Sequence, residues 1–419
     1  MRLSISQPQI YTSSRVNPNP TDQKNETKSE NFHYTPPYTK EECEEAYSRV
    51  FNQIKDRYAA FDQKSEIGFG EQQGLKGLTG NIHDVSKEDI CKIMMHIHDN
   101  EVLLEQCCNN SAKSPFFDKF YLMKDPDQNW NLRLHHFNAR GSGLGGDDSP
   151  HYHRWTLASK PLQGGYINVN YEEKEISPET DEQHKYSKYL LGATDAQSSK
   201  VGRQIQPLGQ SEMKPVKYTL FEEGSTNHFP ITDPHSVLTQ PKHFGSTVTL
   251  AHTGKPVHES SFAFEKGDLK DIPQMRFDSI SEFKSHLEKE IAFLQATQLK
   301  DDLLEHLNGK NPSTLTKHEI DHLCDSKEPN YLETSFFSAL AIYNMAKAEN
   351  EPSHEFSPDT SKFLDERLQH INVEALNEVI KFNQEDLFNP DTRFVTDFSV
   401  ADEISRLRAS MLRPANKTS

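Results

Sequence analysis

The sequence predicts an α+β protein in which an antiparallel β-barrel or sandwich is flanked by helical modules on both sides. Apolar residues recur at helical spacing before residue 115 and again after residue 267. Between these limits, short runs rich in β-branched and aromatic residues alternate with clusters of Gly, Pro, Asp and Asn, which is typical of sandwiches and barrels. A disordered leader, an N-terminal helical module, the β-barrel, a C-terminal helical module and a tail are therefore expected at residues 1–38, 39–114, 115–266, 267–413 and 414–419.

The leader is rich in Ser, Thr, Asn, Gln, Pro and Lys and contains few apolar residues. Such a composition cannot bury enough apolar surface to offset the entropy of ordering, so we expect disorder. Residues 1–20 lack the apolar core of a Sec-type signal peptide. The sequence also contains no apolar run of about eighteen residues, so no membrane span is expected.

Charge and cysteine content narrow the possible partners and compartment. The formal net charge of −17 argues against nucleic acid or an anionic membrane surface as the partner. The five cysteines form no CxxC pair and are odd in number, which suits a reducing compartment. We therefore expect a cytoplasmic protein, although the leader without a Sec signal also fits a secreted bacterial effector.

The N-terminal module is predicted to be helical. Thr39-Lys-Glu-Glu42 forms a capping box, and Ser86 can cap a second helix. The apolar faces that follow these two caps are Tyr47, Val50, Phe51, Ile54 and Tyr58, and then Ile90, Ile93, Met94 and Ile97.

Seven short strands are predicted in the central region. They are expected at 130–137, 155–162, 166–171, 216–222, 236–239, 247–252 and 257–264. Gln163-Gly164-Gly165 predicts a hairpin turn, because glycine supplies the positive φ that such turns need. The polar stretch 172–214 contains few apolar residues and is expected to be a surface excursion.

Helices are predicted again after Asp268. Ser279-Ile-Ser-Glu282 is a capping box, and Phe283, Leu287, Ile291 and Leu294 line one side of the helix that follows. Further helices are expected at 316–325, 330–348, 360–384 and 399–412.

Chemistry is indicated first by His151-Tyr-His153. Residues i and i+2 of an extended strand point to the same side, so one divalent metal can take both imidazoles. The third ligand is expected to be His235, which stands after a Pro-containing turn at the start of a predicted strand. The other candidates for that position are His228, His243 and His252.

The region from about 115 to 265 resembles the cupin superfamily. The likeness is closest to its three-histidine branch, typified by cysteine dioxygenase and related thiol dioxygenases. It rests on Asn131-Leu-Arg-Leu, His151-Tyr-His153, Leu162-Gln-Gly-Gly165 and Pro234-His235-Ser-Val. The resemblance implies a cupin-type barrel in which His151, His153 and His235 bind Fe(II), with nickel or zinc as other possible metals.

Several positions depart from that family. The glutamate that many cupins place after HxH is absent, since Leu157 and Ala158 stand there, and residues 112–130 contain no arginine for a substrate carboxylate. The late Ser-His-Tyr set is replaced by Thr249-Leu-Ala-His252, which lacks the tyrosine and shifts the histidine by one residue, and such a shift turns a strand side chain to the opposite face. Arg154 and His252 remain the candidate catalytic residues, and Arg133 is an alternative site for an anionic substrate.

The leading functional prediction is a metal-dependent oxygenase, or related metalloenzyme, that acts on a small molecule. The first alternative is a non-catalytic cupin-like barrel whose helical flanks bind another protein. The second is a zinc protease, because His318-Glu319-Ile-Asp321-His322 is a formal HExxH motif, with Glu328 or Glu333 as a third ligand. Asp321 is unusual in such a motif, and a solvated helix face is the favoured interpretation of this segment.

Overall fold

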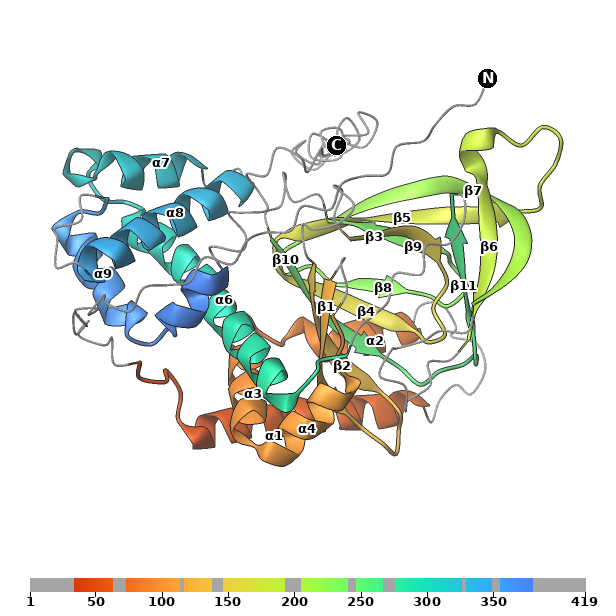
Figure 1. Cartoon of the computed structure of the whole chain (residues 1–419), viewed down its shortest axis with the longest axis horizontal. Helices are drawn as coiled ribbons and strands as arrows, with labels where there is room; N and C mark the ends of the chain where they lie inside the picture. Colours follow the sequence, from red (N-terminus) through yellow and green to blue (C-terminus); the bar gives the residue numbers. More distant parts are fainter. Residues whose placement is uncertain are drawn as a thin grey trace, which may run out of the picture. The chain divides into compact units, whose positions relative to one another are not determined.

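The structure of the protein is a computed structural model (Figure 1). It describes residues 34–62, 73–113, 117–137, 146–192, 205–239, 246–266, 276–325, 329–348 and 355–379. Most of the expected leader, the predicted helix at 399–412 and the tail lie outside these residues. All described residues belong to one unit that begins at His33. None of the described helices combines the length and the hydropathy needed to cross a membrane.

Four helices form the N-terminal part of this unit. They are α1 (Lys40–Asp62), α2 (Gln73–His83), α3 (Lys87–Asp99) and α4 (Glu101–Asn110). Both predicted caps are confirmed: Glu42 N donates to Thr39 Oγ1 at 3.2 Å, and Ser86 forms a reciprocal capping box with Asp89. The predicted apolar face of α3 is fully buried.

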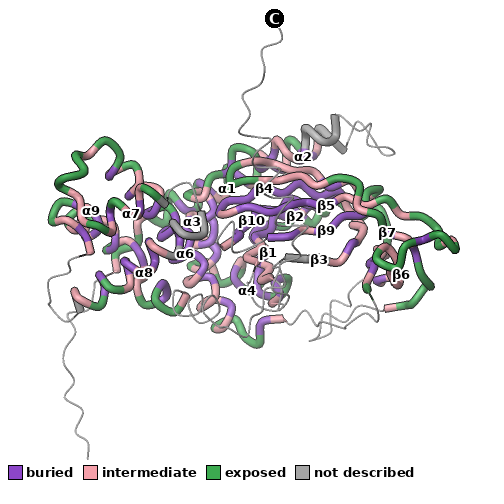
Figure 2. The backbone as a smooth tube through the Cα atoms, turned by 90° about the horizontal axis from the view of Figure 1, so that it is seen from above, coloured by how far each residue is buried: buried purple, intermediate pink, exposed green. Residues whose placement is uncertain are grey.

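Two antiparallel sheets follow, as the sequence predicts. The first sheet runs in the order β1 (Phe117–Lys124), β2 (Asn131–Phe137), β10 (Thr247–Thr253), β4 (Leu157–Gln163) and β8 (Asn227–Phe229). Its middle strands are almost wholly buried (Figure 2). One face packs on the helices, because Leu132, Leu134, Val248 and Leu250 share a core with residues of α1, α3 and α6.

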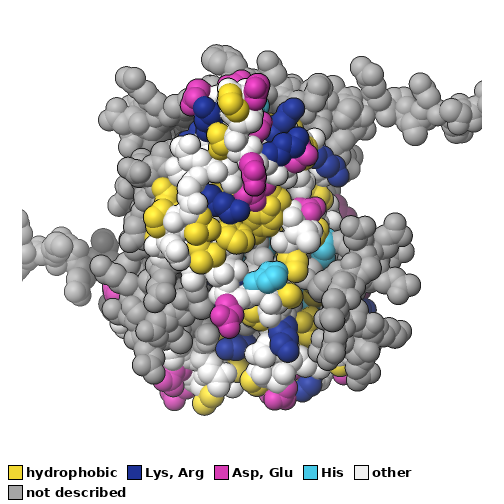
Figure 3. Space-filling view, turned by 90° about the vertical axis from the view of Figure 1, so that its right-hand side faces the viewer, with side chains coloured by type: hydrophobic (Ala, Val, Ile, Leu, Met, Phe, Trp, Pro, Cys, Tyr) yellow, Lys and Arg dark blue, Asp and Glu magenta, His cyan; other side chains and the backbone are white. Residues whose placement is uncertain are grey.

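The second sheet closes into a barrel. Its strand order is β11 (Ser261–Glu265), β3 (Gly146–His151), β9 (His235–Leu238), β5 (Gly165–Lys174), β7 (Ile205–Glu222) and β6 (Lys185–Leu191), and β6 pairs back to β11. Seen from the side of β6, β7 and β11, the surface carries charged side chains of both signs around hydrophobic ones (Figure 3).

The stretch 172–214 was predicted wrongly as a surface excursion. Its described residues supply the end of β5, the short helix η1 (Glu182–His184), all of β6 and half of β7. These strands bury few large apolar side chains, because most residues of β6 and β7 are partly or fully exposed. Low apolar content therefore does not identify a loop in this part of the chain.

The predicted hairpin at Gln163-Gly164-Gly165 is also wrong. Gly164 does have a positive φ of 67°. However, β4 pairs with β10 and β8, whereas β5 pairs with β7 and β9. The glycine turn therefore carries the chain from one sheet to the other.

The C-terminal part is helical. It contains α6 (Ile280–Leu307), the short helix η2 (Pro312–Thr314), α7 (Lys317–Asp325), α8 (Pro329–Ala348) and α9 (Pro358–Leu368). Ser279 caps α6 as predicted, and Phe283, Leu287, Ile291 and Leu294 are buried. The single helix predicted at 360–384 is interrupted after Leu368 because Asn372 caps a new helical segment at 373–379, accepting from Ala375 N at 3.1 Å.

Candidate metal centre

Three histidines from two neighbouring strands converge in the barrel. His151 ends β3, His153 follows two residues later, and His235 begins β9. The backbone pairing of β3 with β9 places His151 opposite His235. The ring centroids lie 4.8 to 4.9 Å apart in all three pairs. One nitrogen from each ring lies within 4.8 Å of the others, so the predicted ligand set is brought together.

A local contact orients the ring of His151, and burial favours the neutral form of His153 and His235. Nδ1 of His151 donates to the Ser149 carbonyl oxygen at 2.9 Å, which leaves Nε2 as the atom that can bind a ligand. Burial and the nearby His235 and His151 hold the pKa of His153 well below its usual range. Burial and His151 likewise lower the pKa of His235, while a hydrogen bond to the backbone of Asp233 acts in the opposite direction. The neutral imidazole favoured here is the form that binds a metal.

The donor set fits a divalent metal with open coordination positions. Three imidazole nitrogens are suitable ligands for iron, zinc, copper or nickel. The positions where a cupin glutamate was sought hold Leu157 and Ala158, both buried in β4. The described cluster therefore supplies nitrogen ligands alone.

Aromatic side chains wall the cluster on the side of the first sheet. The ring of Phe229 lies 4.3 Å from that of His235, and Trp155 stacks on His153 at 6.3 Å. Phe229, Leu157, Tyr166 and Ala251 form a buried apolar group that includes residues of both sheets. This wall restricts the access of water to the histidines from that direction.

A buried arginine lies in the same interior. Arg133 is 6% exposed, and its guanidinium lies 4.5 Å from the ring of Tyr121 and 5.0 Å from that of Trp155. Its Nη2 donates to Thr253 Oγ1 at 3.3 Å, and its Nε has no hydrogen-bond partner. None of the described carboxylates forms an ion pair with it, and burial lowers its pKa. Arg133 therefore presents a desolvated positive charge close to the metal centre.

Arg154 occupies a different environment. Its Nη1 donates to the Glu259 carbonyl oxygen at 3.1 Å, and its guanidinium lies 4.8 Å from the Trp155 ring. Its side chain is part of the barrel's edge, next to the loop after β10. Of the two arginines considered for an anionic substrate, Arg133 is the one that the fold buries.

The other candidate histidines are distinguished by the face of the strand on which each one lies. His252 lies on the helical side of β10, where its ring centroid is 6.0 Å from that of Tyr58 and 5.8 Å from that of Trp130. His228 is on β8 next to Phe229 and so points away from the cluster, and His243 lies outside the described residues. Among the described residues, no contact joins His252 to the three histidines, so its catalytic role stays a prediction without structural support.

The HExxH segment forms α7, but the Glu319 carboxylate caps the start of this helix. This carboxylate accepts from Thr316 N at 2.6 Å and from Ser357 Oγ at 2.8 Å, so it joins the starts of α7 and α9. Glu333, one of the two candidate third ligands, instead accepts hydrogen bonds from Gln163 Nε2 and Ser246 Oγ. No described His, Cys or carboxylate completes a metal group with His318 and His322, and Glu328 lies outside the described residues. The zinc-protease alternative gains no support.

The sequence analysis missed a polar group that lies behind the histidines. Tyr152 Oη donates to Glu173 Oε2 at 3.0 Å, and Glu173 Oε1 accepts from Lys188 Nζ at 2.7 Å and from Ser211 Oγ at 2.8 Å. This group lies across β5, β6 and β7 and holds the residue between His151 and His153. The wrong prediction for 172–214 concealed this group, because Glu173, Lys188 and Ser211 come together only through the pairing of β5, β6 and β7.

No protein-family model and no curated protein matches the chain. Solved structures that resemble it include recombinant pro-11S globulin of pumpkin, at 13% identity and a TM-score of 0.19 over 34% of this chain and 30% of the globulin. A structure described as that of DMSP lyases has 12% identity and a TM-score of 0.23, over 56% of this chain and 98% of that one. The hydroxypropylphosphonic acid epoxidase from S. wedmorenis has 11% identity and a TM-score of 0.20, over 50% and 98%.

Structural similarities this weak do not support any assignment of this chain. The chain also spans less than a third of the globulin's length. The classification rests instead on the chain's own strand order and site. Two antiparallel sheets enclose a histidine cluster formed by β3, β9 and the segment after β3, with helices on the outer face of one sheet. This is a cupin-like α+β protein with a three-histidine cluster consistent with a metal site.

Proposed function

We propose that this protein is a metal-dependent oxygenase of cupin type that acts on a small anionic molecule. The observation that carries the proposal is the convergence of His151, His153 and His235, with one nitrogen from each ring within 4.8 Å of the others. Fe(II) held by these nitrogens would supply the redox chemistry needed to use dioxygen. Nickel and zinc fit the same donors and are distinguished by measurement.

The protein's own residues supply binding and orientation. Arg133 is a buried cation without a described carboxylate partner, so an anionic group of the substrate can satisfy it. A carboxylate or phosphonate bound there would lie beside Trp155, whose other contacts include the ring of His153. Phe229 and Trp155 restrict the access of water to the histidines from one side, which strengthens electrostatic interactions within the site.

Elemental analysis of the purified protein tests the metal. Stoichiometric iron is expected in the wild type and in His322→Ala, and its loss is expected in His153→Ala. His322 is the matched control because it is a buried histidine with a similarly lowered pKa, to about 4, on a different element. Metal lost only from His322→Ala, or no metal in any preparation, would overturn the proposal.

Oxygen uptake with a panel of small thiols, carboxylates and phosphonates tests the reaction. We expect turnover with an anionic member of the panel and at least about a hundredfold loss of kcat/KM in Arg133→Met, because a charge-assisted contact in a water-poor site contributes several kcal/mol. Bound iron without oxygen uptake for any member would instead favour the non-catalytic binding protein. Stoichiometric zinc without oxygen uptake for any member would exclude the oxygenase assignment, because zinc has no redox chemistry.

A further inference from the structure

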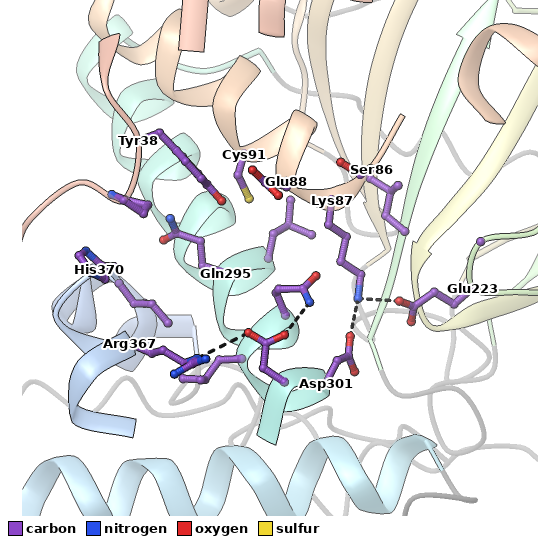
Figure 4. Close-up of a pocket in the computed structure, with 18 of the residues that line it drawn as sticks. Tyr38, Ser86, Lys87, Glu88, Cys91, Glu223, Gln295, Asp301, Arg367 and His370 are labelled. Carbon is purple, nitrogen blue, oxygen red and sulfur yellow. Dashed lines mark hydrogen bonds and ion pairs between the residues drawn. The ribbon is translucent and has the colours of Figure 1, made fainter. Parts of the chain in front are cut away.

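A cavity of about 660 Å³ lies outside the barrel, where the three parts of the fold meet. Its walls come from the segment before α1, from α3, from the end of β4, from the turn after β7, and from α6 and α9 (Figure 4). The volume is in the range of small-molecule sites. Its apolar walls include Leu162, Leu294, Leu299 and Ile371.

The charged side chains of this cavity are already paired within the chain. Lys87 Nζ contacts Glu223 Oε1 at 2.6 Å and Asp301 Oδ2 at 3.1 Å. Arg367 lies 3.7 Å from Asp302, and a similar pair joins Glu88 to Lys92. Lys160, the remaining cation, donates to the carbonyl oxygens of His83 and Val85. A charged ligand is therefore not required to neutralise the cavity.

One lining side chain has unmet hydrogen-bond capacity. Gln295 of α6 is 9% exposed, and neither its Nε2 nor its Oε1 has a partner. Its side chain extends toward the space between Tyr38 and His370 (Figure 4). An unsatisfied buried amide destabilises the folded state by about 1–3 kcal/mol. A ligand that offers one acceptor and one donor side by side would satisfy both atoms.

We propose that this cavity binds an adenine-type nucleoside, with the Gln295 amide paired to the edge of the base. A glutamine amide pairs in a bidentate manner with N6 and N7 of adenine, because those atoms present a donor beside an acceptor. The apolar walls and the Tyr38 ring suit the faces of a planar base.

The charges of the cavity favour a nucleoside over a nucleotide. Four carboxylates line it, namely Glu88, Glu223, Asp301 and Asp302, against the three cations Lys87, Lys160 and Arg367. Because every cation is engaged, a phosphate would have to break an existing pair. A neutral nucleoside needs no such change, and its recognition does not depend on the metal centre.

Isothermal titration calorimetry of the full chain with adenosine tests the proposal. Binding is expected in the wild type, with at least about a tenfold weakening in Gln295→Leu and a similar weakening when inosine replaces adenosine, since inosine presents an acceptor in place of the amino donor. Gln298→Leu is the matched control, because Gln298 lines the same cavity on the same helix but is exposed and donates to Asp302 at 3.0 Å. Its affinity should equal that of the wild type.

The Gln295→Leu protein should remain folded, because the substitution removes an unsatisfied buried amide, and its Tm should equal or exceed that of the wild type. No heat with adenosine at millimolar concentration would overturn the proposal. Equal affinity in Gln295→Leu would do the same. Tighter binding of an N-acetylated dipeptide amide than of adenosine would assign the cavity to a peptide instead.

Discussion

Gln163 and Glu333 join the central sheet to the C-terminal helices by a buried hydrogen bond. Gln163 Nε2, at the end of β4, donates to Glu333 Oε2 of α8 at 3.1 Å. The same amide accepts from Lys87 Nζ of α3 at 3.1 Å, and Glu333 also accepts from Ser246 Oγ at 2.5 Å. One side chain therefore links both helical parts to the sheet between them.

Gln163→Leu should lower the free energy of unfolding by about 1–3 kcal/mol, because Glu333 and Lys87 each lose a buried partner. Urea denaturation measures this change. Gln298→Leu, an exposed glutamine on α6, should change stability by less than about 0.5 kcal/mol. Equal stability of Gln163→Leu and the wild type would show that the link contributes nothing.

Arg133→Met should leave the metal-free protein as stable as the wild type, or more stable by up to about 2 kcal/mol. The substitution removes a buried guanidinium that has no described carboxylate partner. A cost in stability is characteristic of a group retained for binding. Denaturation without ligand checks this, and a clear loss of stability would mean that the guanidinium has a structural role.

His136 and Glu290 should make stability depend on pH. His136 Nδ1 lies 2.6 Å from Glu290 Oε2. Burial lowers the pKa of His136, but the charge and hydrogen bond of Glu290, together with the charges of Asp118 and Glu333, outweigh burial, so the pKa is raised above 6.5. The stabilisation is therefore fully present below pH 6.5 and is lost as the pH rises through the raised pKa.

We expect the difference in unfolding free energy between the wild type and His136→Asn to be larger at about pH 6 than at about pH 8.5. Denaturant titrations at both pH values measure it. The exposed Gln298, which carries no titratable group, provides the control, since Gln298→Leu should give the same difference at both pH values. A difference that grows with pH would contradict the sign of the shift.

His252→Leu should retain the metal and should flatten the acid limb of the stability profile. Burial lowers the pKa of His252 to about 3, so unfolding takes up a proton at this residue between about pH 6.5 and 3. Removing it should reduce the slope by up to about 1.4 kcal/mol per pH unit. Metal content and activity should match the wild type, and loss of either would restore the predicted catalytic role.

Tyr152→Phe should weaken metal binding by about tenfold, because the lost hydrogen bond to Glu173 holds the segment between two ligands. Competition with a chelator measures the affinity. Tyr47→Phe, in α1 against Phe51, is a suitable control and should leave it unchanged. Equal affinity of both variants would show that the HxH segment is positioned by the backbone alone.

Much of the fold follows from local signals that the sequence carries. The helix caps at Thr39, Ser86 and Ser279 and the buried stripes after them depend on neighbours within one helix, and the structure confirms them. The strands β2, β4, β5, β9, β10 and β11 were placed within a few residues, and the strand expected at 216–222 is the second part of β7. The strands β1, β3, β6 and β8 and the first part of β7 were missed. The closing strands β6 and β7 are defined by their pairing with each other, not by their hydropathy.

The site likewise has some features that local sequence determines and others that only strand pairing determines. The sequence by itself determined the metal candidates, since the spacing of His151 and His153 and the turn before His235 are local properties. Adjacent residues of a strand face opposite ways, so only one of His135 and His136 can face the barrel, but the sequence does not show which one.

Tertiary structure decided the rest, because the face a strand buries depends on what packs against it. The helices cover Leu132 and Leu134, so Arg133 turns inward, and the same packing turns His252 away from the barrel. The pairing of β3 with β9 brings His151 opposite His235 across more than eighty residues of chain. Distances of that kind are set by strand register and sheet closure, which no short sequence window contains.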